Sequence, residues 1–213
     1  MTESITYSQW AESEGTDDWQ WIFWGPTAHF RVDAVAGASP LVERIAQIAG
    51  EGDVQPDIDV RRDGVTVRLR DMHGVTQQHL DVAREISAAA RALGLTSDPT
   101  RVETVQIAID ALEPEKVMPF WAAVLGHEEF GGEDVIDPQW RNFGIWFQQM
   151  DAARPQRNRI HIDVSVPPDQ VEARVKAAVA AGGRVLSEHP PTWWTLADPE
   201  GNEVDVTSWL GRD

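Results

Sequence analysis

Two stretches of the C-terminal half decide the fold: NRIHIDVSV at residues 158–166 and LADPEGNEVDV at residues 196–206. In the first stretch, Ile160–Val166 alternates apolar and polar side chains, which is typical of a β-strand with one buried face. In the second, a turn containing proline, glycine and asparagine leads into another alternating run, which predicts a strand at Glu203–Trp209. Between these strands, Asp169–Ala181 is predicted to be a helix that ends at a pair of glycines.

The first part of the C-terminal half has the same order of elements. Val105–Ala111 predicts a strand, and Pro114–Leu125 predicts a helix that ends at a glycine. Sliding one half onto the other by 55 positions places Gln106 on His161. The remaining strands are predicted at Phe143–Met150, Arg184–Ser187 and Trp193–Leu196. The pattern indicates an internal duplication of a βαβββ unit of about 50 residues.

The N-terminal half predicts strands and helices in a different order. An aromatic-rich strand, a helix with one apolar face, an alternating strand and a longer helix are predicted at Trp19–Trp24, Pro40–Ala49, Val65–Leu69 and Gln77–Leu93. The polar segment Thr96–Thr100 (TSDPT) is predicted to be a linker. We therefore expect an α+β protein with two domains, residues 1–98 and 99–213, each large enough to bury a core of its own.

The composition excludes several classes of protein. The net charge is −17, from 35 acidic and 18 basic residues, and such a field repels nucleic acids and anionic membranes. There is no cysteine, which rules out disulfides, thiol nucleophiles and thiolate metal sites. The N-terminus, MTESITYSQW, lacks the pattern of a signal peptide, and no apolar run reaches the roughly 20 residues that span a bilayer. We expect a soluble, cytoplasmic protein whose ligand is a small molecule.

Residues 40–93 resemble the pterin-4a-carbinolamine dehydratases. The stretch that carries this resemblance is PDIDVRRDGVTVRLRDMHGVTQQHLDVAREI, residues 56–86. The resemblance implies an α+β sandwich in which helices pack on one face of an antiparallel sheet. It also implies an active site in which histidines serve as acid and base for expelling the 4a-hydroxyl group of the pterin.

The histidines of that family are replaced in this chain. Val54 and Gln55 stand where two adjacent histidines precede the motif proline, and Arg70 occupies the position of the third. Valine does not titrate, glutamine does not shuttle protons and arginine stays protonated, so the family's mechanism does not carry over. His73 and His79 lie nearby and are interpreted as surface histidines, with displaced catalytic groups as the alternative. The module is expected to serve folding, dimerisation or ligand shaping, and dehydration by an altered mechanism is the alternative.

Residues 102–209 resemble the vicinal oxygen chelate superfamily, in particular its glyoxalase-like branch. The residues that carry this resemblance are FWAAVLG at 120–126 and the two stretches quoted first, within the duplicated pattern. The resemblance implies two βαβββ modules that form a cupped sheet around a cavity, often with a divalent metal at its floor. Both of the families that this chain resembles commonly associate, so a homodimer is expected.

The superfamily's metal positions fall on Gln106, Gln148, His161 and Asp205 of this chain. The resemblance therefore implies a site for one divalent ion (Zn²⁺, Ni²⁺, Fe²⁺ or Mn²⁺) held by an imidazole, a carboxylate and two amide oxygens. Amides are weak ligands, and the superfamily also contains metal-free members that bind drugs or other small molecules. For His161 the alternatives are a hydrogen bond to substrate or a structural role. For Asp205 the alternative is pairing with a base such as Arg159.

Other residues are predicted to contact a substrate. Strand alternation places Asp163 on the same side as His161. Asp163 and Glu203 are also the candidate bases for moving a proton in a metal-assisted reaction. The predicted substrate-binding residues are Trp146, Asp163, Trp193 and Trp194.

Three functions are compatible with these patterns. The first is an enzyme in which a metal assists a lyase, isomerase or oxygenase reaction of a small oxygen-rich substrate. The second is a metal-free binding or resistance protein with an acidic, tryptophan-lined cup. The third is 4a-hydroxytetrahydrobiopterin dehydration in the N-terminal module. Metal content after purification separates the first two, and a dehydratase assay with and without Arg70→His tests the third.

Overall fold

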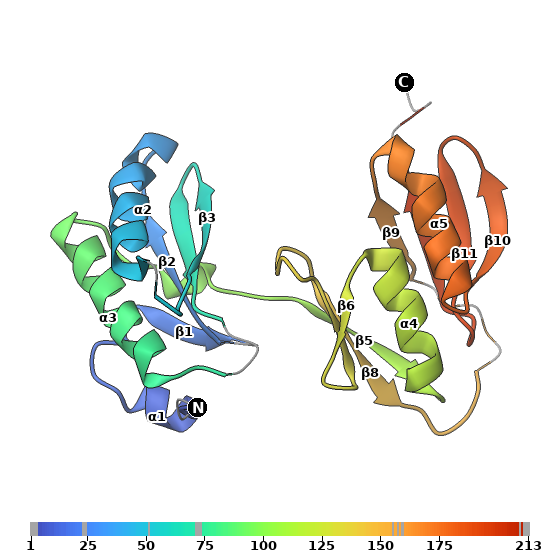
Figure 1. Cartoon of the computed structure of the whole chain (residues 1–213), viewed down its shortest axis with the longest axis horizontal. Coiled ribbons are helices and arrows are strands. Elements are labelled where there is room, and N and C mark those ends of the chain that lie inside the picture. The colour runs from blue at the N-terminus through green and yellow to red at the C-terminus, as the bar shows by residue number, and fades with distance from the viewer. Residues whose placement is uncertain are drawn as a thin grey trace. The chain divides into compact units, whose positions relative to one another are not determined.

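A computed structural model describes residues 4–22, 25–50, 52–70, 74–154, 156, 158, 160–208 and 210. The chain divides into two compact units, Met1–Thr104 and Val105–Asp213. Each unit combines helices with β-sheet, which confirms the predicted α+β class (Figure 1). Among the described residues, no helix has both the length and the apolar composition needed to cross a bilayer.

The N-terminal unit is a four-stranded antiparallel sheet in the order β1-β2-β4-β3 with two long helices, α2 and α3. Its elements are α1 (Tyr7–Ala11), β1 (Trp19–Ile22), β2 (Gly25–Arg31), α2 (Val35–Ala49), β3 (Asp57–Arg61), β4 (Gly64–Arg68), α3 (Gln77–Ala92) and the 3-10 helix η1 (Pro99–Arg101). Helix α2 begins before the predicted start at Pro40, because Ala38 extends the buried stripe formed by Leu41 and Ile45.

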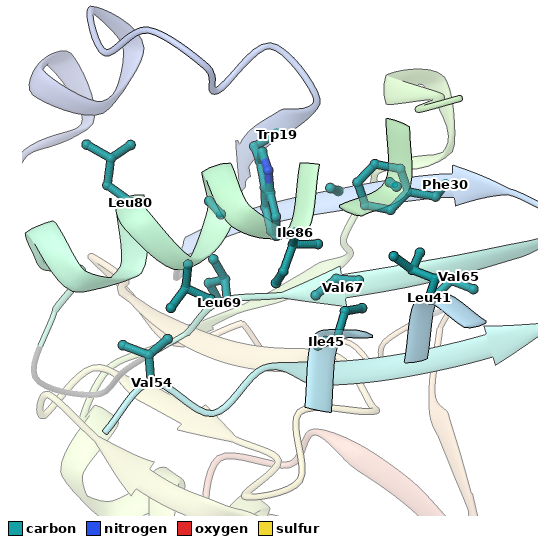
Figure 2. Close-up of a cluster of buried hydrophobic side chains, with 14 of the residues drawn as sticks. Trp19, Phe30, Leu41, Ile45, Val54, Val65, Val67, Leu69, Leu80 and Ile86 are labelled. Carbon is teal, nitrogen blue, oxygen red and sulfur yellow. The ribbon is translucent and has the colours of Figure 1, made fainter. Parts of the chain in front are cut away.

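The core of the N-terminal unit lies between this sheet and the helices α2 and α3 (Figure 2). Phe30 of β2 is the ladder partner of Val65 of β4, and both are buried, as is Val67 two residues farther along β4. Trp19 belongs to the same core, and its indole Nε1 donates a hydrogen bond to Ser87 Oγ at 3.0 Å. This bond satisfies two polar groups that are removed from water, which is a requirement of a stable core.

The predicted linker is attached to the N-terminal sheet over much of its length. The backbone N–H of Arg31 donates to the carbonyl of Thr96 at 3.0 Å, and that of Asp98 donates to the carbonyl of His29 at 2.8 Å. The Arg31 guanidinium also forms an ion pair with the Asp98 carboxylate at 2.5 Å. Hydrogen bonds from the Thr100 hydroxyl and from Arg31 lower the pKa of Asp98 to about 2. The segment therefore continues the N-terminal unit up to η1.

The C-terminal unit contains two βαβββ modules, as the internal duplication predicts. The first comprises β5 (Gln106–Ala111), α4 (Pro114–Leu125), β6 (Glu128–Phe130), β7 (Asp134–Ile136) and β8 (Gly144–Gln149). The second comprises β9 (Ile162–Ser165), the 3-10 helix η2 (Pro168–Gln170), α5 (Val171–Ala180), β10 (Arg184–His189), β11 (Trp193–Ala197) and β12 (Glu203–Thr207). In each module the first strand pairs in parallel with the last, in the orders β5-β8-β7-β6 and β9-β12-β11-β10.

The two modules are joined through their helices and through the turn that precedes β12. Helices α4 and α5 lie side by side, and apolar residues of both modules form one continuous core (Figure 1). Trp121 of α4 donates from its indole Nε1 to the Asp198 carboxylate at 3.0 Å. The Glu200 carboxylate accepts hydrogen bonds from the backbone N–H groups of Leu112 and Glu113 at 2.9 and 2.8 Å. Since a helix start carries exposed N–H groups and partial positive charge, Glu200 caps α4 from the other module.

Candidate functional site

The two stretches that define the second module form neighbouring parallel strands, β9 and β12. In this pairing Asp163 lies directly opposite Asp205. The valines between and beside them, Val164, Val204 and Val206, belong to the core or pack against it. Because successive strand residues point to opposite faces, both aspartates project from the face of the sheet that is turned away from this core.

His161 joins these two aspartates at the start of β9. Its Nε2 lies 3.4 Å from Oδ1 of Asp163 and 3.8 Å from Oδ2 of Asp205. One donor atom from each of the three side chains lies within 4.8 Å of the others. The side chains of His161, Asp163 and Asp205 are 48%, 62% and 19% exposed, so that an ion or small molecule from solvent can reach them. We refer to these three residues as the His161 cluster.

The chemistry of the His161 cluster suits a divalent metal ion. Two ligands of one ion, each at about 2.1 Å from it, lie about 3.0–3.4 Å apart in octahedral or tetrahedral geometry. The distances from the imidazole to the two carboxylates are at or slightly above this separation. Without a cation, two carboxylates directly opposite in a ladder repel each other and destabilise the sheet. A cation bound between the two carboxylates would offset this repulsion.

The two predicted glutamine ligands lie on the sheet of the first module. Gln148 of β8 is opposite Asp110 of β5, which lies four residues beyond Gln106. Four strand residues correspond to about 13 Å, so the two glutamines do not meet. Gln106 donates from Nε2 to Asp134 Oδ1 at 3.3 Å, and burial raises the pKa of that carboxyl. No hydrogen bond between described residues connects either glutamine with the His161 cluster.

The predicted substrate-binding residues divide between different faces and sheets. Trp193 lies on the face of the second sheet that carries the His161 cluster, and it stacks on His189 with ring centroids 4.4 Å apart. Trp194 packs against the core on the opposite face, because consecutive strand residues alternate. Trp146 is half-buried on β8 of the first module. Only Trp193 and Asp163 of the predicted set therefore share the face of the cluster.

The main addition to the predicted metal site is Asp163. From the sequence, Asp163 is predicted to contact substrate or to transfer a proton, although it lies two residues from His161 on the same strand face. The signal that could have identified it is the i, i+2 spacing of an imidazole and a carboxylate in an alternating strand. The register of β9 against β12, which brings Asp163 opposite Asp205, could not be read from the sequence.

The three altered positions of the dehydratase-like module have structural contacts in the N-terminal unit. Val54 is 4% exposed and belongs to the core, as Figure 2 shows. Gln55 donates from Nε2 to the carbonyl of Gly52 at 2.7 Å, just beyond α2. The largely buried guanidinium of Arg70 lies 3.5 Å from the Asp57 carboxylate. Each of these three residues therefore has a structural contact, and none of them needs an acid–base role to explain its presence.

His79 caps a helix and is not a surface histidine, so that prediction is wrong. It is 2% exposed, and its Nδ1 lies 3.0 Å from Thr76 Oγ1 and accepts from the backbone N–H of Thr76 at 3.2 Å. The imidazole takes the place that glutamate or glutamine has in a capping box at the start of α3. The predictions for His73 and Arg159 fall outside the described residues.

Comparison with protein families gives a match within the second unit. A family model described as a glyoxalase-like domain matches residues 106–207. The C-terminal unit carries a glyoxalase-like domain. The match includes the whole His161 cluster and both βαβββ modules. No curated protein matches this chain.

Parts of the chain are similar to solved structures. The fosfomycin resistance protein FosX from Mesorhizobium loti is 9% identical over 49% of this chain and 90% of that one, with a TM-score of 0.40. A glyoxalase-related enzyme from Fulvimarina pelagi is 19% identical over 51% of this chain and 87% of that one, with a TM-score of 0.37. A transcriptional coactivator/pterin dehydratase from Brucella melitensis is 25% identical over 41% of this chain and 99% of that one, with a TM-score of 0.38. At these TM-scores the similarities do not identify an activity.

Proposed function

We propose that the glyoxalase-like domain binds one divalent metal ion through His161, Asp163 and Asp205. The bound ion would serve a lyase, isomerase or oxygenase reaction of a small, oxygen-bearing substrate. The observation that supports this most directly is the meeting of an imidazole and two carboxylates within 4.8 Å on an accessible sheet face. The direct opposition of the two aspartates in the ladder adds support, because such a pair is unfavourable unless a cation lies beside it.

The donor set of the His161 cluster favours particular ions. Carboxylate oxygens suit Mn²⁺, whereas imidazole suits iron, zinc and nickel, and structural zinc sites are richer in sulfur and nitrogen. One nitrogen and two carboxylates, in a chain without cysteine, therefore favour Mn²⁺ or Fe²⁺ among the four ions expected from the sequence. Three protein ligands also leave coordination positions for substrate, as in catalytic metal sites.

When bound, such an ion acts as a Lewis acid that polarises the oxygens of a substrate. The side chains around the ion would orient the substrate and transfer protons. Glu203 lies two residues before Asp205 on β12, on the same face and about 7 Å along the strand. Because Asp163 is assigned to the metal, we assign Glu203 to holding or moving a proton. Trp193 presents a ring on this face that can stack on a flat substrate.

Metal binding by three variants tests this function. Isothermal titration with Mn²⁺ compares the wild type with His161→Ala and Asp205→Asn. The control is Asp110→Asn, which removes an exposed carboxylate from the other sheet. We expect one Mn²⁺ per chain, affinity at least about tenfold lower in both cluster variants, and no change in the control. Equal affinity in all four proteins, or no binding by the wild type, would refute the metal site.

A metal-free binding protein is the second candidate, and one observation favours it. The stacked rings of His189 and Trp193 form an aromatic surface on the same face as the His161 cluster. An aromatic or cationic ligand would find both a flat surface and negative charge there. In that case ligand binding is unchanged by a chelator and by His161→Ala, whereas Trp193→Leu weakens it.

We also propose that two copies of the chain associate through strands β5 and β9. Each of these strands is at the end of its sheet, and no described strand pairs with its outer side. Val105 and Ile160 precede them at repeat-equivalent positions and are 65% and 83% exposed. Unpaired edges beside exposed apolar side chains favour association with another strand. Sedimentation should show a dimer that Val105→Lys combined with Ile160→Lys converts to a monomer, and a wild-type monomer would contradict this proposal.

A further inference from the structure

His161 depends on contacts outside the β-ladder for its position. The pairing of β9 with β12 begins with Ile162 opposite Val204, so His161 precedes the first paired residue. Ile160, on its other side, is 83% exposed. The imidazole Nε2 faces the two carboxylates, whereas Nδ1 makes no hydrogen bond with a described residue. Among the described residues, the ring therefore has no second hydrogen bond of the kind that usually orients a metal-binding histidine.

A side-chain hydrogen bond from the described residue Asn158 attaches this segment to the rest of the domain. Asn158 donates from Nδ2 to Asn202 Oδ1 at 2.7 Å. Asn202 is itself held by the Asp198 carboxylate, which accepts from its Nδ2 at 2.7 Å and from its backbone N–H at 2.9 Å. Asp198 is fully buried and also accepts from the backbone of Glu200 and Gly201. Asn158 is therefore attached to a turn that the hydrogen bonds of Asp198 hold in place.

The same turn leads directly into β12, the strand that carries Asp205. Asp205 follows Asn202 by three residues, and His161 follows Asn158 by three residues. The hydrogen bond between Asn158 and Asn202 therefore joins the segment before His161 to the segment before Asp205, three residues before each of them. We infer that Asn158 is a positioning residue, which holds His161 beside Asp205 through its bond to Asn202. This inference rests on the proposed metal function.

Loss of the Asn158 amide has a selective consequence. Asp163 and Asp205 remain in their ladder positions, because backbone pairing holds them. The segment before β9 loses the attachment that Asn158 provides, and the imidazole is expected to move away from the carboxylates. Mn²⁺ then binds through the two carboxylates alone, about tenfold more weakly, which is the lower end of the effect of outer-shell partners. The thermal midpoint changes little, because Asn158 is exposed.

The experiment compares the wild type with Asn158→Ala, Asn158→Gln and His161→Ala. Gln149→Ala is the control, since it also removes an exposed carboxamide donor. Gln149 donates to the backbone carbonyls of Leu112 and Met150, and it lies on the sheet of the first module rather than on that of the His161 cluster. Titration calorimetry gives the Mn²⁺ affinity, pulsed EPR detects the nitrogen of a coordinated imidazole, and thermal unfolding reports stability.

We expect the nitrogen signal in the wild type, in Gln149→Ala and in part in Asn158→Gln, which keeps the donor. It should be absent from Asn158→Ala and His161→Ala, with unfolding midpoints close to that of the wild type. If Asn158→Ala keeps both the affinity and the nitrogen signal, the positioning role is refuted and the metal site stands. If the wild type binds no Mn²⁺, or binds it without a nitrogen signal, the metal site fails and the positioning role fails with it.

Discussion

Replacing Asp163 by asparagine should stabilise the metal-free protein. The facing oxygens of Asp163 and Asp205 lie within 4.8 Å, and two unit charges at that distance repel by about 0.9 kcal/mol even at the dielectric constant of water. Measured cross-strand pairs give about 0.2–1 kcal/mol. We therefore expect Asp163→Asn to gain about 0.5–1 kcal/mol. In a unit of about 110 residues this raises the unfolding midpoint by about 2–4 °C.

With metal present the order should reverse. At a Mn²⁺ concentration of about 100 times its dissociation constant, binding stabilises the wild type by about 2.7 kcal/mol. Loss of a direct carboxylate ligand weakens binding by about a hundredfold, the upper end of the effect of outer-shell changes. The same Mn²⁺ concentration then stabilises Asp163→Asn by only about 0.4 kcal/mol. The variant should be the more stable protein without metal and the less stable one with it.

Thermal unfolding with a chelator and with Mn²⁺ measures both states in one set of samples. Asp110→Asn controls for the general relief of negative charge, because Asp110 is exposed on the equivalent first strand but faces Gln148. A chelator-treated Asp163→Asn no more stable than this control would refute the proposed repulsion. An equal gain from Mn²⁺ in wild type and variant would refute the role of Asp163 as a ligand.

Three further outcomes are expected. Asp98→Asn should lower the urea midpoint of the N-terminal unit. Because the folded pKa of Asp98 is about 2 against an ordinary 3.8, the wild-type advantage is complete above about pH 4 and disappears as the pH falls through about 2. Asp198→Ala should destabilise the glyoxalase-like domain by about 3 kcal/mol or more in denaturant, since five donors, including the Trp121 indole, lose their acceptor. Neither the wild type nor Arg70→His should dehydrate a 4a-hydroxypterin, and turnover by the wild type would contradict a purely structural N-terminal unit.

Much of the fold could be predicted from the alternation of apolar and polar residues and from the internal repeat. The alternation in IHIDVSV and in the residues after the Asp198 turn predicted β9 and β12, and it placed His161 and Asp163 on one face. The 55-residue self-similarity predicted the second module from the first. These features are local, since a strand with one buried side shows a period of two whatever its partner is.

The features that the sequence did not predict depend on partners distant along the chain. Register decides that Gln106 and Gln148 lie apart, and no residue type at either position reveals it. Trp193 and Trp194 are both predicted to contact substrate, yet neighbouring strand residues point to opposite faces, and Trp194 packs against the core. His79 is interpreted from the sequence as a surface histidine, whereas its imidazole bonds to Thr76, the N-cap residue of α3, and is buried.

Because Glu200 of the second module caps α4 of the first, the two modules cannot be separated without loss of these contacts. Copies of a repeated unit commonly share an apolar core, because one copy alone cannot bury its hydrophobic face. Here the first helix begins on an acid from the second copy, and its Trp121 indole is satisfied there as well. A fragment that ends before β9 would leave these groups without acceptors in a shared apolar surface. We therefore expect the two modules to fold together, and neither to be stable as a separate fragment.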